Sequence, residues 1–83
     1  MLPSKDEIFT LLTEKIRQVV PELGARQIAM SDSMADLGVN SMERGDILLD
    51  TMEALDLQIP LVTLHGSRNL GDLAQLLRDK LGG

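Results

Sequence analysis

The sequence has 83 residues, 43% of them hydrophobic, with 13 acidic against 8 basic side chains and a formal net charge of −5. A chain of this length predicts one small domain over residues 1–83 with a modest core. Phe9 is the single aromatic residue, so the core is aliphatic, which suits a small helical bundle. We expect no nucleic-acid partner, because an acidic surface repels phosphates and the chain lacks the set of aromatic side chains on which bases stack.

Composition also limits the kinds of site and the compartment. The chain has no cysteine, which rules out disulfides, thiolate nucleophiles and cysteine-based metal sites. The first residues lack a basic stretch followed by an apolar one, and no apolar run is long enough to cross a bilayer. We therefore expect a cytoplasmic monomer that binds neither a membrane nor a metal ion.

The first predicted element is a helix over residues 4–20. Ser4 and Glu7 have the spacing of a capping box, in which each side chain satisfies a backbone N–H of the first turn. Pro21 ends the helix because its ring opposes continuation. The apolar residues that follow the cap have the spacing of one helical face: Ile8, Leu11, Leu12, Ile16, Val19 and Val20.

A long loop is predicted over residues 22–40, where the helical periodicity is lost and glycine, serine and aspartate interrupt the chain. We expect one short turn within it, over residues 34–37, capped by Ser31 or Asp32. Loops of this length inside compact domains are uncommon and often functional.

The second half of the chain predicts three further elements. A long helix covers residues 41–56, and residues 61–65 form a short third helix or turn after an extended stretch that ends at Pro60. Asn69 caps a last helix over residues 70–81. Alternating β-patterns are absent, so the fold class is all-α: a four-helix bundle with a long first loop and a short third helix.

No catalytic group of residues is visible in the sequence. His65 is the one histidine, and a lone histidine beside a glycine is more often a surface residue than a catalytic base. Glycine-rich phosphate loops are absent as well. We expect that the chain is not an enzyme.

The informative segment is the junction at residues 36–42. Gly38 permits a sharp turn, and the long second helix starts at or next to Ser41, which predicts an exposed hydroxyl on a firm element. A phosphate esterified there would be stabilised by free backbone N–H groups and the positive end of the helix dipole. The alternative is that Asn40 or Ser41 is simply the N-cap of the helix.

Several short segments at fixed spacing stand out along the chain: Asp32-Ser33-Met34, Asp36-Leu37-Gly38, Asn40-Ser41-Met42, Ile59-Pro60 and Asn69-Leu70-Gly71-Asp72-Leu73. With these segments the chain resembles the acyl carrier protein family over almost its full length. In that family the serine after Leu-Gly-x-Asp carries 4′-phosphopantetheine, whose thiol holds acyl groups as thioesters; that serine falls on Ser41. Ser33 has a similar triplet, but Gly38 follows it too closely for a long helix to start there.

The second predicted helix also offers a surface for partners. Its helical spacing places Glu43, Asp46, Asp50 and Glu53 on one stripe, flanked by Met42 and Leu49. Such a surface suits brief docking on basic proteins, although it could also be a solubilising face. The family resemblance favours docking, because this helix is the main recognition element of carrier proteins. The residues expected to face the core are Leu48, Thr51, Met52 and Leu55, with Ile47 at the edge.

A narrower resemblance concerns residues 39–44, Val-Asn-Ser-Met-Glu-Arg, which look like the free-standing donor carriers of polyketide β-branching cassettes. Those proteins hold an acetyl or similar short acyl group for an enzyme similar to hydroxymethylglutaryl-CoA (HMG-CoA) synthase. Asn40 replaces the usual aspartate, which removes a charge beside the arm. Arg44 is either neutral or a mark of partner specificity, and the resemblance favours the second.

The predicted function is therefore a carrier of short acyl groups for polyketide biosynthesis, with 4′-phosphopantetheine on Ser41. Its implied partners are a phosphopantetheinyl transferase, an acyltransferase, and an HMG-CoA synthase-like enzyme or a ketosynthase. The alternatives are a fatty-acid or peptidyl carrier and, from a different class, an unmodified acidic helical adaptor.

Overall fold

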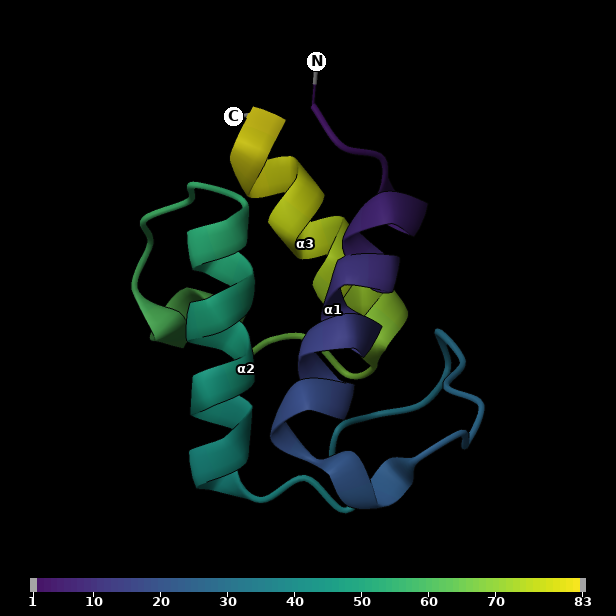
Figure 1. The fold of residues 1–83 in the computed structure, drawn as a ribbon. Coiled ribbons are helices and arrows are strands. Elements are labelled where there is room, and N and C mark those ends of the chain that lie inside the picture. Colours follow the sequence, from purple (N-terminus) through teal and green to yellow (C-terminus); the bar gives the residue numbers. More distant parts are fainter. Residues whose placement is uncertain (1, 83) are drawn as a thin grey trace.

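The computed structural model describes residues 2–82, and within them it contains helices and turns but no strand (Figure 1). The all-α prediction is confirmed. The predicted short third helix or turn is a 3-10 turn, and a second 3-10 turn follows the first helix, so residues 2–82 contain three α-helices and two such turns. The elements in chain order are α1 (Lys5–Val19), η1 (Pro21–Leu23), α2 (Ser41–Ala54), η2 (Leu61–Leu64) and α3 (Leu70–Gly82).

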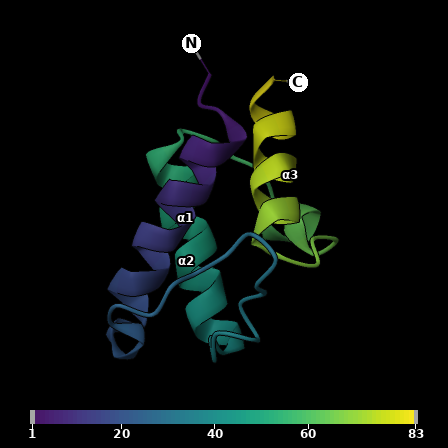
Figure 2. The same cartoon turned by 90° about the vertical axis from the view of Figure 1, so that its right-hand side faces the viewer.

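Helix α1 packs against both α2 and α3, and the loop before α2 passes around the end of the bundle where α1 stops (Figures 1 and 2). The apolar face predicted for α1 is confirmed by Ile8, Leu12 and Ile16, whose side chains have no exposed surface. Ile47 was expected at the edge of the core but is also fully buried, because α2 presents a wide face to α1. The other buried residues of the helices and of η2 are Leu48, Thr51, Met52, Leu64, Leu70, Gly71, Leu73, Ala74 and Leu77.

The long loop is tied to the bundle by its own apolar side chains and by backbone hydrogen bonds to α3. The backbone N–H of Gly71 donates to the Met30 carbonyl at 2.8 Å, and that of Leu70 donates to the Asp32 carbonyl at 2.9 Å. A Cβ at Gly71 would lie 3.2 Å from the Met30 Cβ, so this close approach favours glycine. The loop residues buried in the core are Ile28, Met34, Leu37 and Val39.

The short turn predicted at residues 34–37 is present, but its cap is Ser33 and not Ser31 or Asp32. The Ser33 hydroxyl accepts a hydrogen bond from the Asp36 N–H at 3.0 Å, and the Asp36 carboxylate accepts one from the Ser33 N–H at 3.2 Å. Asp32 belongs instead to the preceding turn, where its carboxylate accepts a hydrogen bond from the Ala29 N–H at 2.9 Å.

Helix α2 ends two residues before the predicted boundary because the chain turns through a left-handed residue. Asp56 has φ of 53°, and the N–H groups of Asp56 and Leu57 donate to the carbonyls of Glu53 and Met52 at 3.1 and 2.9 Å. This pair of bonds is the Schellman motif, which usually has glycine at the position of Asp56. The predicted caps of the other helices, Ser4 and Asn69, are both confirmed.

Within residues 2–82, none of the helices combines the length and the apolar character that crossing a membrane requires.

The capping box of α1 predicts a specific dependence of stability on pH. Hydrogen bonds from the Ser4 backbone N–H, at 2.8 Å, and from the Ser4 side chain hold the pKa of the Glu7 carboxyl below its usual value. Because the folded pKa is lowered, this stabilisation is present above the unfolded pKa and is lost as the pH falls through the folded value. Glu7→Gln keeps an accepting oxygen but not the charge.

The expected result is that wild type melts at a higher temperature than Glu7→Gln at neutral pH, and that the difference shrinks when the pH falls below about 4. Thermal melts followed by circular dichroism from neutral to acidic pH measure it. A difference that stays constant over this range would contradict the assignment.

Candidate functional site

The junction before α2 is a tight turn held between two buried side chains. Gly38 has φ of 81°, a left-handed conformation that favours glycine, and the Val39 N–H donates to the Met34 carbonyl at 2.9 Å. Leu37 and Val39 are 3% and 9% exposed, so they anchor the chain on either side of the turn. The direction in which the chain enters α2 is therefore fixed by packing.

Asn40 is the N-cap of α2; the sequence alone had left both Asn40 and Ser41 as candidates. Its side-chain oxygen accepts a hydrogen bond from the Glu43 N–H at 2.8 Å, and the Glu43 carboxylate accepts one from the Asn40 N–H at 3.1 Å. This reciprocal pair is a capping box with asparagine in place of serine or threonine. The Ser41 hydroxyl is consequently not the capping group.

Ser41 is the first residue of α2, and its side chain is exposed. The first helical hydrogen bond at this end joins the Arg44 N–H to the Asn40 carbonyl at 2.8 Å, so the N–H groups of Ser41 and Met42 precede the helical ladder. Free N–H groups at a helix start stabilise a negative charge. These residues fit a phosphate ester on the Ser41 oxygen.

Ser33 offers a poorer position for a phosphate. Its side chain is only partly exposed, and its hydroxyl already accepts the Asp36 N–H in the turn described above. Substitution of that oxygen by a bulky group would disturb the turn that leads to Gly38.

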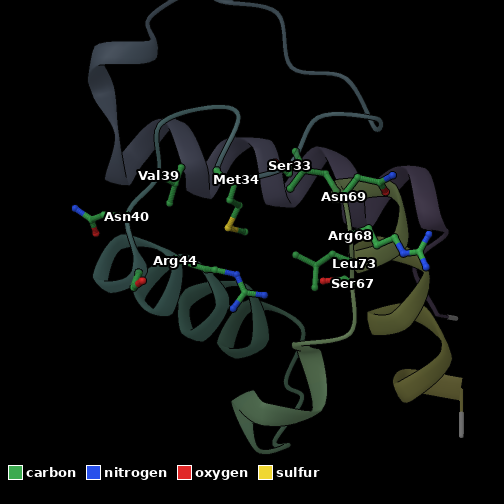
Figure 3. A pocket seen from close by; sticks show the side chains of 12 residues that line it. Ser33, Met34, Val39, Asn40, Arg44, Ser67, Arg68, Asn69 and Leu73 are labelled. Atoms are coloured by element: carbon green, nitrogen blue, oxygen red, sulfur yellow. The ribbon is translucent and has the colours of Figure 1, made fainter.

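Two hollows meet at Ser41, and Arg44 lines both of them. The first, of about 380 Å³, lies between the loop, α2 and the start of α3 (Figure 3), and the second, of about 600 Å³, lies between α2 and η2. Sequence reasoning missed them because their walls come from segments far apart in the chain. The residues that share the walls with Ser41 and Arg44 include Ser33, Asn40, Ser67, Arg68 and Asn69 in the first hollow and Leu48, Leu61 and His65 in the second.

The outer face of α2 combines exposed carboxylates with exposed apolar side chains. Met42 is 80% and Leu49 is 52% exposed, and helical spacing places them on the same stripe as the exposed Asp46, Asp50 and Glu53. We call these five residues the α2 stripe. Glu43, which the helical spacing places beside these residues, is half-buried, and its carboxylate accepts the Asn40 N–H.

A metal site is not found in the part of the chain that the structure describes, where no group of three or more histidine, aspartate or glutamate side chains could hold an ion. His65 is exposed at the end of η2.

Comparison with known proteins identifies the class of this fold and site. The family model described as "Phosphopantetheine attachment site" matches residues 11–77, and the chain belongs to this family of acyl carrier proteins, which carry groups and do not catalyse. The chain is similar to the polyketide biosynthesis acyl-carrier-protein AcpK of Bacillus subtilis (strain 168), with 38% identity over 93% of this chain and 94% of that protein.

A solved structure gives a second similarity. The fold matches a chain from the crystal structure of the curacin biosynthetic pathway HMG synthase in complex with acetyl donor-ACP, with a TM-score of 0.89 and 34% identity. The match covers 93% of this chain and 99% of that one. The family prediction and the acyl carrier fold are thereby confirmed.

The Asn40 cap predicts a graded response to substitution. Asn40→Ala removes the oxygen that accepts the Glu43 N–H and should lower the free energy of unfolding by about 0.5–2 kcal/mol. Asn40→Asp keeps an accepting oxygen and should retain the stability, since aspartate caps as well as asparagine. Urea unfolding of the three proteins measures the difference, and equal losses in both variants would contradict the role of the cap.

Proposed function

We propose that this chain, as a single domain over residues 1–83, is an acyl carrier protein of polyketide biosynthesis. In this proposal Ser41 carries 4′-phosphopantetheine, and the arm holds an acetyl group that is donated to an HMG-CoA synthase-like enzyme during β-branching. The observation that carries the proposal is the exposed Ser41 at the first position of α2, in a chain similar to AcpK and to a chain of the HMG synthase complex with its acetyl donor-ACP.

Attachment is a phosphoryl transfer from coenzyme A. The Ser41 oxygen attacks the β-phosphorus, a new P–O bond forms, and the pyrophosphate bond breaks, releasing 3′,5′-ADP. The hydroxyl proton passes to a base of the transferase. The chain contributes a fixed oxygen and, through the free N–H groups of Ser41 and Met42, a favourable field for the resulting phosphodiester. Once attached, the arm supplies the thiol on which acyl groups are carried as thioesters.

The partners follow from this cycle. A phosphopantetheinyl transferase loads the arm, an acyltransferase charges it, and an HMG-CoA synthase-like enzyme or, in a related pathway, a ketosynthase accepts the acyl group. We place the protein in the cytoplasm as a monomer. The α2 stripe begins at Met42, the residue after Ser41, and runs along the same helix, so a partner that contacts its first turns is close to the point where the arm is attached.

Attachment is tested by incubating the purified apo-protein with coenzyme A and a broad-specificity phosphopantetheinyl transferase. Wild type should gain the mass of one phosphopantetheine, because one exposed serine occupies the helix start. Ser41→Ala should gain nothing. Intact-protein mass spectrometry, with peptide mapping of the modified residue, reads out both results.

Ser33→Ala is the matched control and should still gain one arm, provided circular dichroism shows that it is folded. Modification at Ser33, or none in wild type, would overturn the proposal; the second result is what an unmodified acidic adaptor predicts.

Docking through the α2 stripe predicts a charge-dependent transfer rate. The double variant Asp46→Lys and Asp50→Lys should slow acetyl transfer from the loaded protein to an HMG-CoA synthase-like enzyme by about tenfold or more at low salt, because steering of a basic partner is lost. Loss of acetyl from the carrier, followed by mass spectrometry at sub-saturating enzyme, measures the rate.

The control for net charge is Glu14→Lys combined with Glu22→Lys, since both residues are exposed and lie outside α2. This variant has the same total charge and should transfer at nearly the wild-type rate. If both double variants slow transfer equally, overall charge and not the α2 stripe is responsible.

A further inference from the structure

The surroundings of Ser41 are cationic in a chain that is acidic overall. The net charge is −5, yet neither of the two hollows that meet at Ser41 is lined by a carboxylate. Their walls contain two arginines, Arg68 in the first hollow and Arg44 in both. The local charge around Ser41 is therefore opposite to that of the α2 stripe on the neighbouring face of the same helix.

Arg44 is the basic side chain best placed to meet a group on Ser41. The two residues are three positions apart in α2, which places their Cβ atoms about 5–6 Å from each other on one face. Figure 3 shows the Arg44 side chain reaching from α2 into the first hollow, while Asn40 points away from it. The long stem of Arg44 has several rotamers, and side chains on a helix lean toward its N-terminus, the end at which Ser41 lies.

The helix gives Arg44 no carboxylate with which to pair. The positions three and four residues away on either side hold Asn40, Ser41, Ile47 and Leu48, of which the last two are buried. Glu43, its neighbour in sequence, has its carboxylate bound to the Asn40 N–H. A half-buried guanidinium with these neighbours can take an anion as a partner.

We propose that Arg44 is a positioning residue that pairs with the phosphodiester of the arm on Ser41 within the same chain. This inference rests on the proposed attachment at Ser41. Paired N–H donors of the guanidinium, together with the free N–H groups of the first turn, would hold the phosphate and set the direction in which the arm leaves α2. The role differs from recognition of a partner, because it operates in the isolated protein.

The test compares apo and holo forms of wild type, Arg44→Gln and Arg68→Gln, each loaded to completion and verified by intact mass. Arg68 is exposed and lines the first hollow, so its variant is the matched loss of one positive charge. In wild type, loading should shift the Arg44 Nε–H resonance and raise the melting temperature by about 4 °C or more, the range expected for one charge-assisted pair in a domain of this size. The phosphorus-31 resonance should change in Arg44→Gln but not in Arg68→Gln.

The outcomes separate the two proposals. If wild type gains no arm at Ser41, the proposed function and this inference both fail. If Ser41 is loaded but the Arg44 resonance is unmoved, or if Arg44→Gln retains the full rise in melting temperature, only the role of Arg44 is overturned. Arg44→Lys should recover part of the rise in melting temperature, since lysine supplies the charge but not the bidentate geometry. If Arg44→Lys recovers nothing and Arg68→Gln reduces the rise as much as Arg44→Gln does, the role of Arg44 is also overturned.

Discussion

The reciprocal hydrogen-bond pair between Asn40 and Glu43 is the constraint on which the functional end of the molecule depends. The two hydrogen bonds, of 2.8 and 3.1 Å, hold the first turn of α2 and make Asn40 its cap. The Ser41 oxygen, at the first helical position, is therefore left free. The cap is itself held in place by the left-handed turn at Gly38 between the buried Leu37 and Val39. The packing of the loop therefore determines how the exposed Ser41 is oriented.

Helix α2 borders two surfaces of opposite charge. Its outer stripe carries Asp46, Asp50 and Glu53 with two exposed apolar side chains, whereas the hollows next to Ser41 contain basic groups and no carboxylate. Carboxylates on the stripe suit steering of basic proteins, and the cationic hollows suit a phosphodiester.

Local signals in the sequence were sufficient wherever a structure depends on neighbouring residues. The capping box of Ser4 and Glu7, the Asn69 cap and the apolar period of α1 predicted their helices correctly, because caps and helical faces are set within one or two turns. The errors concern which of several similar residues makes a local contact. Asp56, at a position where glycine is usual, adopts the left-handed conformation that ends α2 early. Ser33 caps the turn at residues 34–37, while Asp32 accepts the Ala29 N–H.

The sequence by itself determined the class of the protein, the all-α fold and the serine at which the proposed attachment occurs, because these depend on short motifs at fixed spacing. Only the tertiary structure decided that Asn40 is the cap, that the Glu43 carboxylate accepts the Asn40 N–H, and that Ser41 and Arg44 border two hollows. The walls of those hollows come from the loop, η2 and the start of α3, which approach one another only when the core is buried. Contacts between segments distant in the chain are not encoded in local periodicity, and for that reason the surroundings of Arg44 could not be read from the sequence.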